Sequence, residues 1–158
     1  MKTRFILIAV LLLAAGASRA SAQKLVVFAD ESFRAALKEI APAFKENTGF
    51  DIRVVMQSSD KLAKRILDGT PVDLFFPASE DAMRLVMEKG LVDVALKRNI
   101  LMGPPAEPVA EGVPAEPQYV SAAVTINAAQ RLQAMAFLEY LASEPARGVF
   151  ARHGFALP

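Results

Sequence analysis

The sequence predicts an α/β fold: a single, mainly parallel sheet with helices on both faces. Short apolar runs rich in β-branched residues alternate three times with helical patterns, and the joins between them are short. That order is typical of parallel strands connected by right-handed crossover helices. The length of 158 residues suits one domain with a real core and is small for two.

The first strand and helix lie near the start of this pattern. Residues 24–29 (KLVVFA) predict a buried strand. One helical face then carries four apolar residues: Phe33, Leu37, Ile40 and Phe44. Pro42 lies inside this helical pattern and leaves room for a kink or a break near Ala41. Gly49 predicts the end of the helix.

Two more strand–helix units follow. Residues 51–57 predict the second strand, and Gly69 closes the helix after it. The apolar face of that helix consists of Leu62, Ala63, Ile66 and Leu67. Residues 71–78 predict the third strand. The third helix has Ser79 as its N-cap and Gly90 after its last turn.

The second part of the chain begins with a change of composition. Residues 103–118 contain five prolines and two glycines and predict an extended linker. Residues 119–125 predict a further strand. We expect Asn127 to cap a helix after it and Ser143 to cap a last helix that ends at Gly154. The predicted core draws on all of these elements: Val26, Val27, Phe28, Leu37, Ile40, Phe44, Val54, Val55, Leu62, Ile66, Leu74, Phe75, Phe137, Leu138 and Phe150.

The first 22 residues have the pattern of a cleavable secretory signal peptide. A basic start precedes eleven apolar residues, 5–15, and Ala20-Ser21-Ala22 fits a cleavage site before Gln23. The domain prediction is therefore a signal peptide at 1–22, one α/β unit built from 23–102 and 119–158, and a linker at 103–118. Export through a signal peptide places the mature chain in the periplasm.

Composition excludes several classes of function. The chain has no cysteine, which excludes a disulfide framework, a lipid-anchored cysteine and a Cys-ligated metal. Without residues 1–22 the chain keeps 15 basic and 17 acidic residues, a net charge of −2. This balance gives no electrostatic case for binding nucleic acid.

Serines stand where predicted strands give way to helices. Ser32 follows the first strand, Ser58 and Ser59 follow the second, and Ser79 follows the third. Ligands of open α/β sheets bind beyond the carboxyl ends of the strands, and free N–H groups at helix starts attract anions. Serine is also a favoured N-cap on any helix, so capping alone is an alternative reading of all four positions.

Two stretches of the chain resemble periplasmic molybdate-binding proteins of ABC importers, which belong to the type 2 periplasmic-binding-protein family. Residues 26–93 resemble the N-terminal part of these proteins, and residues 119–158 resemble their C-terminal part. The matching motifs are the serine after the first strand, the Ser-Ser pair, Val72-Asp73-Leu74-Phe75 and Gly154-Phe155. The resemblance implies one lobe of a periplasmic-binding-protein fold. It also implies that Ser32 and Ser59 hydrogen-bond a tetrahedral oxyanion, molybdate or tungstate.

The sequence departs from this family in two ways. Family members have two lobes with the oxyanion between them, whereas here residues 103–118 alone stand in place of most of the second lobe. Acidic Asp30 and Glu31 precede Ser32, and Asp60 follows Ser59, where a dianion would be repelled. We expect weakened oxyanion binding.

The predicted function is therefore a secreted solute-binding protein with no cofactor. Its expected partners are a small oxyanion and an ABC transporter permease, and the sequence sets no oligomeric state. The alternative is a one-lobe interaction module that binds no ligand, or a truncated remnant of a solute-binding protein. An enzyme is not expected: His153 is the single histidine, and a helix C-terminus explains it. The resemblance supplies no catalytic or metal-ligating residue.

Overall fold

The computed structural model describes residues 23–103 and 117–158, so the predicted signal peptide and most of the predicted linker lie outside the described residues. The elements, in chain order, are β1 Leu25–Asp30, the 3₁₀ turn η1 Glu31–Phe33, α2 Arg34–Thr48, β2 Ile52–Gln57, α3 Ser59–Leu67, β3 Leu74–Phe76, α4 Glu80–Glu88, β4 Val92–Met102, β5 Tyr119–Thr125, α5 Arg131–Leu141 and α6 Glu144–Arg152. In the described part of the chain, no helix has the length and apolar character needed to cross a membrane.

The predicted α/β class is confirmed, with a five-stranded sheet in the order β2-β1-β3-β5-β4. The strands β2, β1 and β3 run parallel, whereas β5 is antiparallel to both β3 and β4. The three parallel strands, β2, β1 and β3, are the three strands that the sequence predicted to be parallel. The edge strand β4 was not predicted, and β5 runs in the opposite direction to β3.

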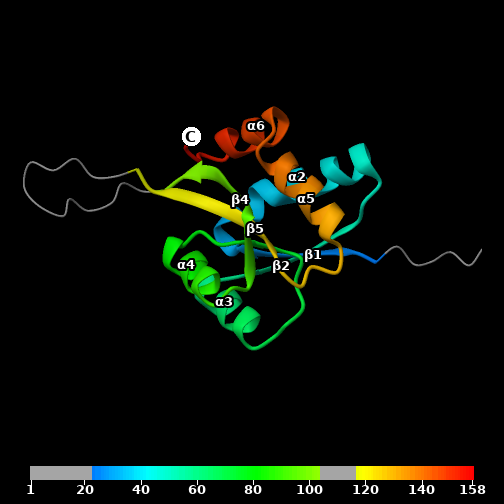
Figure 1. The fold of residues 1–158 in the computed structure, drawn as a ribbon. Helices are drawn as coiled ribbons and strands as arrows, with labels where there is room; N and C mark the ends of the chain where they lie inside the picture. Colours follow the sequence, from blue (N-terminus) through cyan, green and yellow to red (C-terminus); the bar gives the residue numbers. More distant parts are fainter. Residues whose placement is uncertain (1–22, 104–116) are drawn as a thin grey trace, which may run out of the picture.

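Helices cover both faces of the sheet, as predicted (Figure 1). The helices α2, α5 and α6 pack on one face, and α3 and α4 pack together on the other. Residues of β1 alternate between the two layers, as the period of a strand requires. Leu25 and Val27 face the larger cluster, and Phe28 faces the smaller one.

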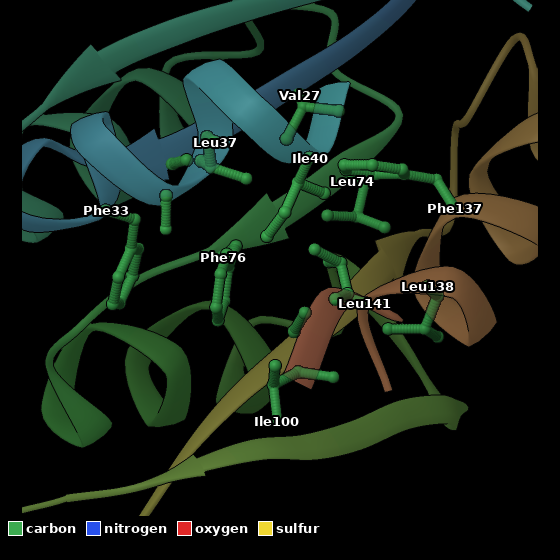
Figure 2. Close-up of a cluster of buried hydrophobic side chains, with 14 of the residues drawn as sticks. Val27, Phe33, Leu37, Ile40, Leu74, Phe76, Ile100, Phe137, Leu138 and Leu141 are labelled. Atoms are coloured by element: carbon green, nitrogen blue, oxygen red, sulfur yellow. The ribbon is translucent and has the colours of Figure 1, made fainter. Parts of the chain in front are cut away.

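The larger core cluster joins residues from both halves of the chain. Figure 2 shows Ile40 of α2 near Leu74 of β3 and near Phe137 and Leu141 of α5, with Leu37 farther along α2. All five side chains are at most 1% exposed. Because residues on both sides of residues 104–116 share this cluster, they form one folded unit.

Most of the predicted core is buried, with three exceptions. Val54 and Val55 are half-buried because β2 is an edge strand with one neighbour. Val26, close to the start of β1, is also half-buried. The predicted face of α2 is fully buried, and α2 continues through Pro42 without a break.

The predicted C-terminal ends of the helices match the structure, whereas two of the predicted N-caps do not. Gly49 follows α2 in the left-handed region, with φ 76°, where a residue with a Cβ is strained. Asn127 is not a cap: α5 begins at Arg131, and Gln130 takes the cap position. Ser143 does precede α6, but its hydroxyl donates to the Tyr140 carbonyl at 2.6 Å instead of accepting from the helix.

Candidate anion site

The site lies where the three parallel strands end. Asp30 and Gln57 are register partners at the carboxyl ends of β1 and β2, and Phe76 ends β3 beside Ala29. A helical segment or a short loop begins directly after each strand. The first amides of these segments therefore meet at one edge of the sheet, as expected for an open α/β sheet.

The Asp30 carboxylate is the point on which these groups converge. Its Oδ1 accepts a hydrogen bond from the Ser32 N–H at 3.0 Å. Its Oδ2 accepts from the Ser59 N–H at 2.8 Å and from the Ser59 hydroxyl at 2.6 Å. Asp30 thus caps the turn η1 and also binds the first amide of α3, 29 residues along the chain.

The Ser59 hydroxyl connects all three strand ends. While it donates to Asp30, its oxygen accepts from the N–H of Ala78 at 2.9 Å and of Ser79 at 3.3 Å. Ala78 and Ser79 form the loop between β3 and α4. Ser59 is 5% exposed, so these bonds are largely shielded from water.

The structure places the other predicted serines differently. Ser58 occupies the N-cap position of α3 without a side-chain capping bond. Ser79 is a true N-cap, because its hydroxyl accepts from Ala82 N–H at 3.3 Å. Ser32 is exposed and brings its backbone N–H to the site. The backbone N–H of Ser32 and both the N–H and the hydroxyl of Ser59 therefore bond to Asp30, and the binding of an oxyanion by these serines stays a prediction.

The negative charge at this site is held by neutral donors. Asp30 is 8% exposed, and in the described part of the chain no Lys, Arg or His forms an ion pair with it. Burial by itself raises the pKa of this carboxyl group, but the hydrogen bonds from Ser59 and Ser32 outweigh burial and hold the pKa below its usual value. This is the chemistry of an anion site without a cationic side chain.

The neighbouring carboxylates do not share this position. Glu31 and Asp60 are exposed, and neither appears among the hydrogen bonds of the site. Sequence reasoning grouped them with Asp30 as sources of repulsion. The structure separates Asp30 from the other two, because its side chain alone reaches the donors.

A groove of about 300 Å³ lies beside the site, between α4 and the β4–β5 pair. Its lining includes Ser79, Arg84, Lys97 and Tyr119. Asp30, Ser32 and Ser59 do not line it. Of the residues around Asp30, Ser79 lines this groove, and Ala78 and Ser79 line a second hollow next to it.

Two of the quoted motifs have structural roles. Asp73 is 3% exposed and accepts from Val26 N–H at 2.8 Å and Gln130 N–H at 2.9 Å. Phe155 packs against Phe33 and Phe150, with ring centroids 5.5 and 5.8 Å apart. Both motifs hold the second part of the chain against the first.

His153 lies at the C-cap of α6, as its predicted role requires, with Nε2 2.6 Å from Oε1 of Glu39. Among the hydrogen bonds of the described residues, none joins a hydroxyl group to this ring. Within the same residues, no group of three His, Cys, Asp or Glu side chains gathers as a metal site.

Comparison with known proteins finds relatives by sequence and by fold. A family model described as bacterial extracellular solute-binding protein matches residues 25–116 and 103–156. The molybdate-binding protein ModA of Escherichia coli is 36% identical over 87 residues, which cover 55% of this chain and 34% of that protein. The protein of the same name from Haemophilus influenzae is 34% identical over 96 residues, which cover 60% of this chain and 37% of the relative. The matched region thus spans about a third of the length of these relatives.

The fold also resembles that of a solved protein whose sequence identity to this chain is low. The periplasmic molybdate-binding protein of Azotobacter vinelandii superposes with a TM-score of 0.73 at 15% identity, covering 85% of this chain and 100% of that chain. At this identity the likeness concerns the fold alone. Since the family model matches far more than half of the sequence, in both parts of the described structure, the chain belongs to the bacterial extracellular solute-binding protein family.

Proposed function

We propose that this chain is an exported solute-binding lobe that takes a small tetrahedral oxyanion, molybdate or tungstate, at the strand ends near Ser32 and Ser59, with weakened affinity. One observation is the main support for the proposal. The Ser32 N–H, the Ser59 N–H and the Ser59 hydroxyl all point to the two oxygens of one carboxylate. A donor set that holds one oxyanion in a largely buried position suits the oxygens of another.

The chemistry of the donors favours an oxyanion over other solutes. Amide and hydroxyl groups donate to charged oxygens with shorter and stronger hydrogen bonds than to neutral ones. The amide of Ser59 also opens a helix of nine residues, α3, whose dipole favours negative charge. The names of the relatives from Escherichia coli and Haemophilus influenzae point to the same ligand class.

Weak affinity follows from how little of the ligand one lobe can surround. Residues 103–118 stand where the resemblance implies a second lobe with further donors. Hydrogen bonds to a charged group contribute about 1.5–3 kcal/mol each, so two missing donors cost roughly 3–6 kcal/mol. That loss corresponds to about 10² to 10⁴ in affinity.

Export and delivery belong to the same proposal. Residues 1–22 would act as a cleavable signal peptide, which directs the mature chain to the periplasm. An ABC transporter permease is the partner to which such a lobe would present its ligand. Both parts rest on the sequence pattern and on the family.

A titration followed by NMR tests the binding. Molybdate, tungstate and sulfate are added to the purified chain while the amide signals of Ser59, Ala78 and Ser79 are recorded. We expect saturable shifts at these amides with a dissociation constant near the millimolar range, and loss of the shifts in Ser59→Ala. Ser143→Ala, which changes a serine at the start of α6, is the matched control and should leave the shifts unchanged. Shifts spread over the surface, or insensitive to Ser59→Ala, would contradict the proposal.

A further inference from the structure

We propose that Asp30 is an internal ligand: its carboxylate fills the anion position of this lobe, so residue 30 decides whether an external anion can enter. The inference deepens the proposed function and rests on the anion position described there. It concerns the competition between two negatively charged groups for one set of donors.

The Asp30 carboxylate makes a complete set of contacts with the donors of the site. Both carboxylate oxygens are engaged, Oδ1 by the Ser32 N–H and Oδ2 by the N–H and the hydroxyl of Ser59. The Ser59 oxygen in turn accepts from Ala78 and Ser79, so its own hydrogen must point toward Asp30. The hydroxyl is therefore not free to turn to a second acceptor while Asp30 is in place.

The contacts of Asp30 extend to residues that are distant in the sequence. An aspartate at the end of a strand commonly caps the turn that follows, and Asp30 does cap η1. Capping of η1 needs only the hydrogen bond from the Ser32 N–H to Asp30. The bonds to Ser59 come from another strand–helix unit, 29 residues away, and they place the carboxylate among the donors of α3.

The negative charge of Asp30 opposes the binding of an external anion at the same donors. Asp30 is 8% exposed, and in the described part of the chain no cationic side chain forms an ion pair with it. An external oxyanion at the same donors would lie within a few ångströms of this carboxylate, where like charges repel strongly in a shielded site. Entry of the anion therefore requires that the Asp30 side chain leave, and leaving breaks three hydrogen bonds to a charged acceptor.

Substitution at residue 30 tests the inference directly. Asp30→Ala removes the internal ligand and keeps the backbone donors. We expect this variant to have a lower melting temperature than the wild type, and to regain it in a saturable way when formate, sulfate or molybdate is added. We also expect its molybdate affinity, measured by calorimetry, to exceed that of the wild type by about 10-fold to 10³-fold. The matched control is Glu31→Ala, which removes the adjacent exposed carboxylate and should change neither property.

A measurement on the wild type covers the case in which Asp30→Ala does not fold. The amide protons of Ser32 and Ser59 should shift together as Asp30 titrates in acid, because both bond to its carboxylate. If the amide protons of Ser59 and Ser32 do not shift during this titration, the inference is overturned. A folded Asp30→Ala that shows neither rescue by formate nor a gain in molybdate affinity would overturn it too.

These outcomes separate the inference from the proposed function. If the wild type binds molybdate at Ser59 and Asp30→Ala binds it no better, the internal ligand is refuted and the proposed function stands. If formate restores Asp30→Ala but molybdate binds neither protein, the internal ligand stands and the oxyanion function is refuted.

Discussion

The carboxylate of Asp73 accepts a hydrogen bond from the backbone N–H of Gln130 at 2.9 Å, although the two residues lie 57 positions apart. The other oxygen of Asp73 accepts from Val26 N–H at the start of β1. One buried side chain therefore joins the first strand to the N-cap of α5, which lies in the second part of the chain. Removing the Asp73 side chain takes away the acceptor of both amides.

Replacing Asp73 with alanine should destabilise the fold. Because each hydrogen bond to a charged acceptor contributes about 1.5–3 kcal/mol and the site is buried, we expect a loss of roughly 2–4 kcal/mol in the free energy of unfolding. Urea denaturation measures the loss. Asp68→Ala, which removes an exposed carboxylate at the end of α3, is the control and should change stability by less than about 0.5 kcal/mol. Equal effects of the two substitutions would show that the Asp73 bonds contribute little.

Ser59→Ala should also destabilise the protein, through a different set of bonds. The substitution leaves the amides of Ala78 and Ser79 without their acceptor and takes one donor from Asp30. Unpaired buried groups cost about 1–3 kcal/mol, and we expect a loss in that range by thermal or urea denaturation. Ser58→Ala is the control, because the Ser58 hydroxyl makes no capping bond. A Ser58→Ala variant that loses as much as Ser59→Ala would contradict this reading.

Local pattern predicted most of the parallel half of the sheet. The face of α2 follows from apolar residues at helical spacing, and so does that of α3 except at Leu67, which was predicted on the apolar face but is exposed. Gly49 and Ser79 mark boundaries through backbone conformation and capping. In each of these cases the signal lies within one turn of the residue that it explains. The positions of Ser32 and Ser59 at strand ends followed from the same local reasoning.

Features decided by distant partners could not be predicted in this way. The edge strand β4 carries charged Lys97 and Arg98 in its middle and pairs with β5 through irregular register, so its pattern does not alternate cleanly. The start of α5 depends on Asp73 binding the Gln130 amide, which a search for a local cap at Asn127 cannot find. An aspartate after a strand signals the Asp30 cap, but its bond to Ser59 depends on the folded sheet.

The helix α5 offers a test of the core with two leucines on one element. Leu138 is 0% exposed and belongs to the cluster in Figure 2, whereas Leu132 is 77% exposed. Removing a buried leucine side chain costs about 2–5 kcal/mol through lost transfer energy and a cavity. We therefore expect Leu138→Ala to lower the free energy of unfolding by that amount and Leu132→Ala to change it by less than about 0.5 kcal/mol. Similar losses in both variants would show that α5 does not pack as described.

The pKa of Asp30 makes the stability of this site depend on pH in a defined direction. Burial raises the pKa, and the hydrogen bonds from Ser59 and Ser32 lower it further than burial raises it. The folded pKa thus lies below the unfolded value of about 3.9. A carboxyl group shifted downward stabilises the folded state above its unfolded pKa, and this stabilisation is lost as the pH falls through the folded pKa.

Asp30→Asn should therefore destabilise the protein most at neutral pH and least in acid. The asparagine side chain keeps the size of Asp30 but carries no charge, and one of its two terminal groups is a donor that faces the donors of Ser59 or Ser32. The difference in unfolding free energy between wild type and variant, measured by urea denaturation from pH 6 to pH 2, should shrink below about pH 4. Glu39, Asp51 and Asp93, whose pKa values are also lowered, are present in both proteins and cancel in the difference. A difference that stays constant, or grows in acid, would mean that Asp30 is not held as a carboxylate by these donors.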